Sequence, residues 1–349
     1  EGGELTLSSF DYETSARITV AAAVEEAGAA LVSGRLLADI SRSLPNHPVV
    51  LTAEGSALEI ACGSARFTLQ LLPVDDYPEL PAMPEAAGWI TSDVFSKAVS
   101  QVVVAAGKDE LLPVFTGVRV EIEDNEVSLL ATDRYRMALK ELAWTPQERQ
   151  TSAAVLVPGR VLAETAKSMT AGDRVVLAVA AAAAGEGIIG FEGEGHGGLR
   201  QITTRLLDGE FPKVRHLMNI PNELVVRVSV TELAAAVKRV SLVAERNTSL
   251  RMSIEENQIV LEAATGDQAQ AQETVGVVTE NPSGGEQALT QAGFNPQYLG
   301  DILSVIDAPY AHIAFSGSGK PCLIMGLDEI DGEPKEDYRH VIMLMRLPS

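Results

Sequence analysis

One order of elements recurs three times along this chain, and this internal repeat limits the possible folds more than any other feature. The copies follow one another at a spacing of about 120 to 135 residues. Each complete copy reads as a helix, a group of strands, a second helix and a second group of strands. We therefore expect the 349 residues to form three similar α+β domains, at 1–86, 87–214 and 215–349.

The middle copy shows the unit most clearly. Apolar residues at helical spacing predict a helix at 92–106, and a second helix is expected at 158–169 with proline at its start. The expected strands lie at 117–122, 127–132, 138–142, 174–179, 187–191 and 201–206.

The other two copies follow the same order. The third has expected helices at 230–243 and 295–306, with strands at 250–254, 259–264, 311–315 and 322–325. The first matches only from its second strand, at 4–7, through the helix at 33–44. By analogy it lacks an opening helix and strand of about 35 to 45 residues. Units with open strand edges are expected to join edge to edge, and copies joined head to tail close into a ring if the rotation between them allows it.

The net charge of −21 argues against a simple nucleic-acid binder, which should carry a basic surplus. Yet Lys and Arg recur on the expected helices at spacings of seven or eleven residues, which place side chains on one helical face. These candidate DNA-facing residues are Arg35, Arg42, Lys97, Lys108, Arg160, Lys167, Arg239 and Arg246. Ordinary solvated faces are the alternative. Recurrence in four helices favours a basic, helix-lined surface that touches phosphate without reading bases, although the 295–306 helix carries Asp301 and no basic residue.

No catalytic constellation is visible. The five histidines lack metal-ligand spacing, and Cys62 and Cys322 lie far apart, so we expect no metal, cofactor or disulfide and a cytoplasmic location. We expect no membrane span either. The glycine-rich segments 193–198 and 316–320 lack the following helix of a phosphate-binding loop. An enzyme acting on a nucleotide through one of these loops, or a repeat scaffold unrelated to DNA, remain the alternatives.

Five segments resemble the bacterial DNA polymerase III β subunit, the sliding clamp family. They are 112–117 (LPVFTG), 131–138 (ATDRYRMA), 206–214 (LLDGEFPKV), 294–299 (FNPQYL) and 342–347 (IMLMRL). The resemblance covers essentially the whole chain. It implies a non-catalytic processivity factor with three clamp domains, helices inside and antiparallel sheets outside, in a head-to-tail homodimeric ring around duplex DNA. A closed ring stays on DNA by topology, which would reconcile DNA binding with an acidic chain.

The resemblance also implies a groove between domains 2 and 3 that binds peptides of the replicative DNA polymerase, the clamp loader, and other polymerases and repair proteins with clamp-binding motifs. The matching positions are Phe115, Thr132, Arg134, Tyr135, Arg136, Met137, Pro212, Leu217, Met343, Leu344, Met345, Arg346 and Leu347. Met, Leu and Pro suit an adaptable apolar pocket, and Arg136 and Arg346 could hold a peptide's polar ends. The alternative is that these residues only pack the junction.

Two positions depart from the family pattern. Leu344 stands where the family usually has proline, and His216 replaces a residue that is commonly basic. Loss of the proline frees a backbone N–H and changes the tail that forms part of the groove. We therefore hypothesise a specialised second clamp that is resistant to a groove-binding inhibitor.

Overall fold

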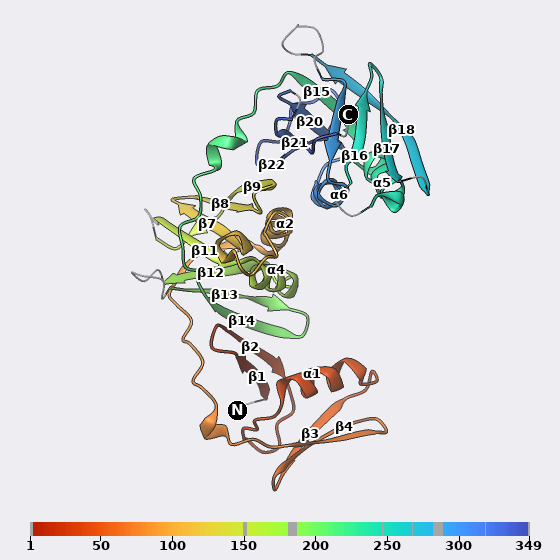
Figure 1. The fold of residues 1–349 in the computed structure, drawn as a ribbon. Coiled ribbons are helices and arrows are strands. Elements are labelled where there is room, and N and C mark those ends of the chain that lie inside the picture. Colours follow the sequence, from red (N-terminus) through yellow and green to blue (C-terminus); the bar gives the residue numbers. More distant parts are fainter. Residues whose placement is uncertain are drawn as a thin grey trace.

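The structure is a computed structural model that describes residues 3–148, 152–180, 187–245, 248–266, 268–281, 289–317 and 319–347. In these ranges the chain forms three units of strands and helices that lie in a curved row (Figure 1). Five helices lie on the concave side of this row: α1 (Gly34–Ser43), α2 (Ser92–Val103), α4 (Gly159–Ser168), α5 (Val230–Val240) and α6 (Pro296–Val305). The expected α+β repeat with helices on the inner side is therefore confirmed.

In the described part of the first unit, α1 is the single α-helix. Its strands are β1 (Glu4–Phe10), β2 (Thr14–Ala21), β3 (Val49–Glu54), β4 (Ala57–Cys62) and β5 (Ala65–Gln70), followed by the short helix η1 (Val74–Asp76). Ser33 caps α1, its hydroxyl accepting the Leu36 N–H at 3.5 Å. The buried core of this unit is small and consists of Leu58, Ile60 and Leu69.

The second unit pairs α2 with α4. Its remaining elements are β6 (Ala86–Thr91), α3 (Pro113–Thr116), β7 (Gly117–Glu123), β8 (Glu126–Thr132), β9 (Arg136–Ala143), β10 (Thr145–Pro146), β11 (Ser152–Pro158), β12 (Arg174–Ala180), β13 (Ile188–Gly195) and β14 (Gly198–Arg205). Helix α2 ends three residues before its expected end, and the Gly107 N–H donates to the Phe115 carbonyl at 2.7 Å. This bond turns the chain back toward α3. Lys108 therefore lies in a loop, and its expected place on the helix is wrong.

The third unit pairs α5 with α6. Its other elements are β15 (Leu224–Ser229), η3 (Ser241–Val243), β16 (Leu250–Ile254), β17 (Gln258–Thr265), β18 (Ala269–Glu280), β19 (Gln291–Phe294), β20 (Tyr310–Phe315), β21 (Cys322–Leu327) and β22 (Tyr338–Ile342). The long strand β18 was not expected from the sequence, because most of its residues are polar or small and give no clear apolar face.

Strand edges join the units, as the sequence predicts. Among the described residues, a seven-stranded sheet of order β1-β2-β14-β13-β12-β6-β10 connects the first and second units through the antiparallel pair β2–β14. A twelve-stranded sheet of order β11-β7-β8-β9-β22-β21-β20-β15-β18-β17-β16-β19 connects the second and third through β9–β22. Strands β3, β4 and β5 form a separate sheet.

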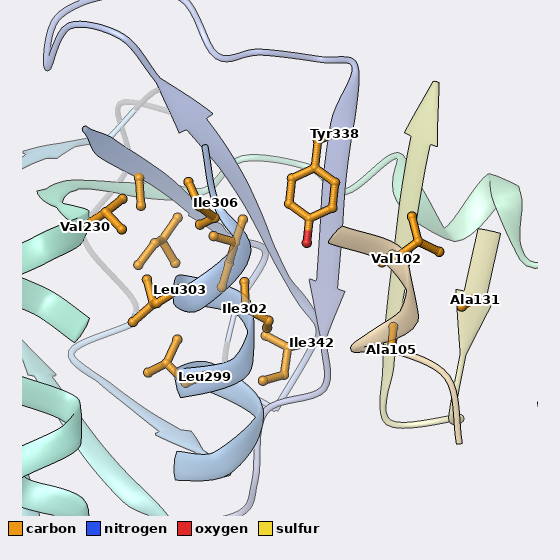
Figure 2. Close-up of a cluster of buried hydrophobic side chains, with 14 of the residues drawn as sticks. Val102, Ala105, Ala131, Val230, Leu299, Ile302, Leu303, Ile306, Tyr338 and Ile342 are labelled. Atoms are coloured by element: carbon orange, nitrogen blue, oxygen red, sulfur yellow. The ribbon is translucent and has the colours of Figure 1, made fainter. Parts of the chain in front are cut away.

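One apolar core runs through the second and third units. Figure 2 shows Tyr338 of β22 between Ile302 of α6 and the helix's C-cap Ile306 on one side and Val102 of α2 on the other. The Tyr338 hydroxyl donates to the Gln101 carbonyl at 3.1 Å and lies 2.9 Å from Nδ1 of His340. The second junction is therefore both apolar and hydrogen-bonded in its interior.

Candidate functional site

The C-terminal tail lies between the second and third units. It extends the β9–β22 ladder, which ends at the pair Arg136–Ile342. The Met343 N–H then donates to the Tyr135 carbonyl of the second unit, and the Met345 N–H to the Gly293 carbonyl of the third, both at 2.8 Å. A side chain at Gly293 would place a Cβ 2.7 Å from the Met345 carbonyl oxygen, so the tail needs glycine there.

A tight turn at 132–136 faces this tail. The Thr132 hydroxyl donates to the Arg136 carbonyl at 2.8 Å and accepts the Arg134 N–H at 3.1 Å. The Asp133 carboxylate accepts the N–H groups of Tyr135 and Arg136 at 3.0 and 2.9 Å. Arg134 has φ of +80°, a strained value for a residue with a side chain. These local bonds hold the strained turn and point the Tyr135 carbonyl at the tail.

Arg136 is the buried centre of the turn. Its Nε donates to Asp133 at 3.0 Å and its Nη1 to Asp301 of α6 at 2.8 Å. Its guanidinium carbon lies 4.1 Å from the Tyr298 ring centroid, within cation–π distance. The side chain is only 5% exposed, so its contacts in this structure are with Asp133, Asp301 and Tyr298, and its expected contact with a peptide stays a prediction.

Tyr298 and Asp301 were absent from the residues proposed from sequence. Asn295 starts α6, its side chain accepting the N–H groups of Gln297 and Tyr298 at 3.0 and 3.2 Å. Tyr298 and Asp301 then share one helical face, three residues apart. This spacing was the available signal, but it does not reveal a partner in another unit. Burial, with the Asp133 charge adding to it, raises the pKa of Tyr298 above its ordinary value.

The chain between the second and third units forms the other side of the site. Phe211 precedes the short helix η2 (Arg215–Met218) and Met218 is its last residue, and both pack in one buried cluster with Met137 and Val341. Arg215 fastens this connector to the sheet through ion pairs with Glu121 at 3.0 Å and with Glu141. The connector thus has a fixed position, with Pro212 half-buried at its edge.

The rim above this cluster is apolar and exposed. Tyr135 is 56% exposed, Leu217 51% and Met343 41%. Three separate segments, the turn, the connector and the tail, supply these side chains. Large apolar groups left in water over a formed base are typical of a surface that binds a partner's apolar side chains.

The other predicted groove residues lie on both sides of this rim. The Arg134 guanidinium carbon is 5.7 Å from the Phe115 ring centroid in the second unit. Leu344 is buried, Arg346 is exposed, and Leu347 packs over Gly293. The Met343 and Met345 N–H groups are bonded, whereas no bond of the Leu344 N–H occurs among the described residues. Proline at 344 would therefore cost no hydrogen bond in this part of the chain.

Most of the predicted basic residues are exposed on the concave-side helices. Arg35 and Arg42 lie on α1, Lys97 on α2, Arg160 and Lys167 on α4, and Arg239 on α5, while Arg246 falls outside the described residues. Four of them have acidic partners: Asp39 for Arg42 at 2.9 Å, Asp307 for Lys97, Glu164 for Arg160 at 3.2 Å, and Glu273 for Arg239 at 2.9 Å. These pairs weaken the local positive potential.

The two glycine-rich segments lie between antiparallel strands. Segment 193–198 is part of the β13–β14 hairpin, in which Gly195 pairs with Gly198. Segment 316–320 connects β20 with β21, and its Ser318 lies outside the described residues. Neither segment precedes a helix, so neither has the helix N-terminus that a phosphate loop uses. Within the described ranges no helix has both the length and the apolar character needed to cross a membrane.

Comparisons with known proteins cover the whole chain. Family models described as "DNA polymerase III beta subunit" match in order, the N-terminal domain at residues 1–81, the central domain at 89–213 and the C-terminal domain at 219–346. The "Beta sliding clamp" of Streptomyces coelicolor is 50% identical over 347 residues, covering 99% of this chain and 90% of the relative. "Beta sliding clamp homolog GriR" of Streptomyces muensis is 40% identical over 349 residues, covering 99% and 89%.

Solved structures agree with these matches. The DNA polymerase III beta subunit of Thermotoga maritima superposes with a TM-score of 0.81 at 26% identity, covering 100% of this chain and 90% of that one. A sliding clamp of Pseudomonas aeruginosa bound to griselimycin superposes with a TM-score of 0.80 at 25% identity, covering 99% and 89%.

Proposed function

Because the chain belongs to the DNA polymerase III beta subunit family, the beta sliding clamps, we propose that it encircles duplex DNA and tethers polymerases through the site at its second junction. The chain is a sliding clamp, which is a processivity factor and not a catalytic subunit. The observation that carries the proposal is the curved row of units with five helices on its concave side (Figure 1). A concave surface of this kind suits a duplex passing through a ring.

The proposed assembly is a homodimeric ring of two chains joined head to tail. We propose domain limits of 1–86, 87–214 and 215–349, and a cytoplasmic location. Within the chain, both junctions are strand-to-strand contacts, and β3 is an edge strand with no second partner among the described strands. Free strand edges readily pair with another chain, and heterologous contacts that close produce rings. Sedimentation velocity that gave only the mass of one chain would contradict the dimer.

The proposed DNA-facing residues are Arg35, Arg42, Lys97, Lys108, Arg160, Lys167, Arg239 and Arg246. Their contacts are expected to go to phosphate and to be independent of sequence. Reversing Arg35 and Lys167 to Glu is expected to weaken loading onto DNA, since both side chains are exposed on concave-side helices. Lys213→Glu is the control, because Lys213 is exposed on the connector instead. Equal loading of the unaltered chain, the double variant and the Lys213→Glu control contradicts the basic inner surface.

Topology provides the decisive test of the ring. The protein is loaded onto nicked circular DNA by a clamp loader and separated from free protein by gel filtration, before and after the DNA is linearised. Retention on the circle and loss from the linear DNA are expected, because a ring slides off free ends. Equal retention on both forms contradicts encirclement. A rise in melting temperature with added nucleotide would instead favour the enzyme alternative.

The proposed peptide groove combines the turn, the connector and the tail. Its residues are Phe115, Thr132, Arg134, Tyr135, Arg136, Met137, Pro212, Leu217, Met343, Leu344, Met345, Arg346 and Leu347. The proposed partners are the replicative DNA polymerase, the clamp loader, and other polymerases and repair proteins with clamp-binding motifs. The exposed apolar rim over a fixed base supports this proposal, because short peptides bind through a few apolar anchors.

Two exposed side chains allow a test without disturbing the core. The double variant Leu217→Ala and Met343→Ala is expected to weaken binding of a labelled polymerase clamp-binding peptide by at least about tenfold. Leu242→Ala is the matched control, since Leu242 is 82% exposed on η3, in the third unit's helical region. Fluorescence anisotropy gives the dissociation constants. Unchanged affinity in the double variant contradicts the groove.

A second proposal concerns Leu344. We propose that this chain is a specialised clamp with reduced sensitivity to a groove-binding inhibitor. Similarity to GriR and to a clamp solved with griselimycin supports this idea. Since proline at 344 costs no hydrogen bond here, Leu344→Pro is expected to fold and to bind griselimycin more tightly than the unaltered chain. Equal affinities of the two proteins for griselimycin, measured by calorimetry, would contradict this proposal.

A further inference from the structure

Asp301 lies on α6 of the third unit, yet its carboxylate contacts a side chain of the second. Its Oδ2 accepts the hydrogen bond from Nη1 of Arg136 at 2.8 Å. The Asp301 side chain is 30% exposed, whereas that of Arg136 is almost fully covered. The contact therefore joins a partly exposed face of α6 to the buried interior of the turn at 132–136.

The turn by itself holds only one end of the Arg136 guanidinium. Asp133 uses Oδ1 for the Tyr135 and Arg136 N–H groups and Oδ2 for Nε of Arg136. The Nη1 end is held by Asp301, and Tyr298 of the same helix covers the guanidinium plane. A buried cation left without one of its carboxylates shifts to regain solvent or another acceptor. Loss of the Asp301 charge would therefore loosen Arg136 and the turn around it.

The geometry of this turn determines two walls of the groove. Its Tyr135 carbonyl holds the Met343 N–H, and so places the tail. Its residue Arg134, at φ of +80°, lies beside Phe115. A turn that relaxes from this strained shape moves the Tyr135 carbonyl and the start of the tail together.

We propose that Asp301 is a positioning residue of the peptide groove. It holds Arg136, and through Arg136 the 132–136 turn, in the shape that accepts a peptide with apolar anchors. This inference rests on the proposed function of the groove. Asp301 acts from α6 without belonging to the apolar rim itself.

The chain supplies a matched control on the same unit. Asp307 lies two residues after the end of α6 and pairs with Lys97 of α2, so it also connects the third unit to the second. Its partner belongs neither to the turn nor to the tail. Asp301→Asn and Asp307→Asn each remove one carboxylate charge from this interface, but only the first touches the groove.

The experiment measures the dissociation constant of a fluorescein-labelled polymerase clamp-binding peptide with the full chain. Asp301→Asn is expected to raise this constant at least about tenfold, and Asp301→Glu, which keeps the charge, less than about threefold. Asp307→Asn is expected to stay within about twofold of the unaltered chain. Retention on nicked circular DNA should be the same for all four proteins, because the ring does not depend on the groove.

Several results would overturn the inference. These are an unchanged constant in Asp301→Asn, an equal loss in Asp307→Asn, or a loss in Asp301→Glu as large as in Asp301→Asn. A further check adds Asp301→Asn to Arg136→Gln, where it should have little additional effect if it acts through Arg136; full additivity contradicts that route. If the unaltered chain binds no peptide, the groove function fails and this inference fails with it.

Discussion

The two junctions between units share one kind of backbone contact but differ in the side chains that support it. In each, one antiparallel strand pair joins two sheets, β2 with β14 at the first and β9 with β22 at the second. At the first junction the pairing is supported by hydroxyl groups, with Ser15 Oγ lying 2.6 Å from Thr203 Oγ1. At the second, the Arg136–Asp301 pair, the Lys97–Asp307 pair and two apolar clusters cross from one unit to the other.

This difference shows that strand pairing aligns units, whereas a shared core makes them stable together. The second and third units bury their apolar residues in shared clusters, while the first keeps a separate one of Leu58, Ile60 and Leu69. The proposed groove lies at the junction with the shared core. A site built from three segments needs this rigidity, because a small shift of one segment would change its shape.

The largest expected effect is that of Arg136→Ala at the second junction. It leaves Asp133 and Asp301 without their common cation, and breaking a buried pair in this way costs about 3 to 5 kcal/mol. Peptide binding should be lost together with stability. Urea unfolding followed by the fluorescence of Trp89 and Trp144, both in the second unit, measures the loss. A change below about 1 kcal/mol would mean that this junction does not depend on its ion pairs.

A smaller effect is expected for Tyr338→Phe in the shared core. The change removes one hydroxyl that bonds the Gln101 carbonyl and contacts His340, and leaves both in a buried place. Such a loss costs about 2 kcal/mol. The same urea titration applies, and Tyr310→Phe, a half-buried tyrosine of β20, serves as the control. Equal effects of the two variants would contradict a special role for Tyr338.

Acid should weaken the second junction by a further, smaller amount. Burial, with the Arg136 charge adding to it, lowers the pKa of His340 to about 3. The unfolded chain then binds this proton more strongly than the folded one. Stability is full above pH 6.5 and declines as the pH falls from 6.5 toward 3. Between pH 7.5 and 5.5 one such histidine lowers the free energy of unfolding by about 1.4 kcal/mol.

The histidine can be isolated by comparing slopes of stability against pH. His340→Gln should flatten the decline between pH 7.5 and 5.5, whatever its effect at neutral pH. A decline in His340→Gln as steep as in the unaltered chain would show that other groups cause it.

The smallest effect is expected at the first junction. Replacing Ser15 by Ala and Thr203 by Val removes both members of the buried hydroxyl pair, and the backbone ladder of β2–β14 stays in place. Because no polar group is left unpaired, stability should change by less than about 0.5 kcal/mol. Limited proteolysis of the segment 71–85 would report loosening of the first unit. Rapid cleavage of this segment in the double variant would show that the hydroxyl pair stabilises the first junction.

The threefold repeat and most element positions could be predicted because they depend on local periodicity. The strands at 117–122 and 127–132 and the helix at 158–169 match β7, β8 and α4 to within one residue at each end. Strand β18 could not be found in this way, because its partners β15 and β17 stabilise it without a clear apolar pattern. The end of α2 depended on a bond between Gly107 and Phe115 that no helical periodicity contains.

Only part of the candidate site could be predicted from the sequence. The turn and the tail were found as motifs, and the structure brings them together through the Met343–Tyr135 bond. The buried state of Arg136 could not be read, because it depends on Asp301, which is 165 residues away in the chain. An arginine within a polar motif is expected at the surface. Whether it is buried depends on partners that only the tertiary structure brings close.

The twelve-stranded sheet has a mechanical consequence. A continuous hydrogen-bonded ladder with a common interior resists bending, so the second and third units form a stiff segment of the arc. The β2–β14 contact is a backbone ladder with the Ser15–Thr203 hydroxyl pair, and the first unit keeps its own buried cluster, so we expect this contact to be the softer joint. Elastic changes in curvature should therefore concentrate at that joint and leave the proposed peptide groove undeformed.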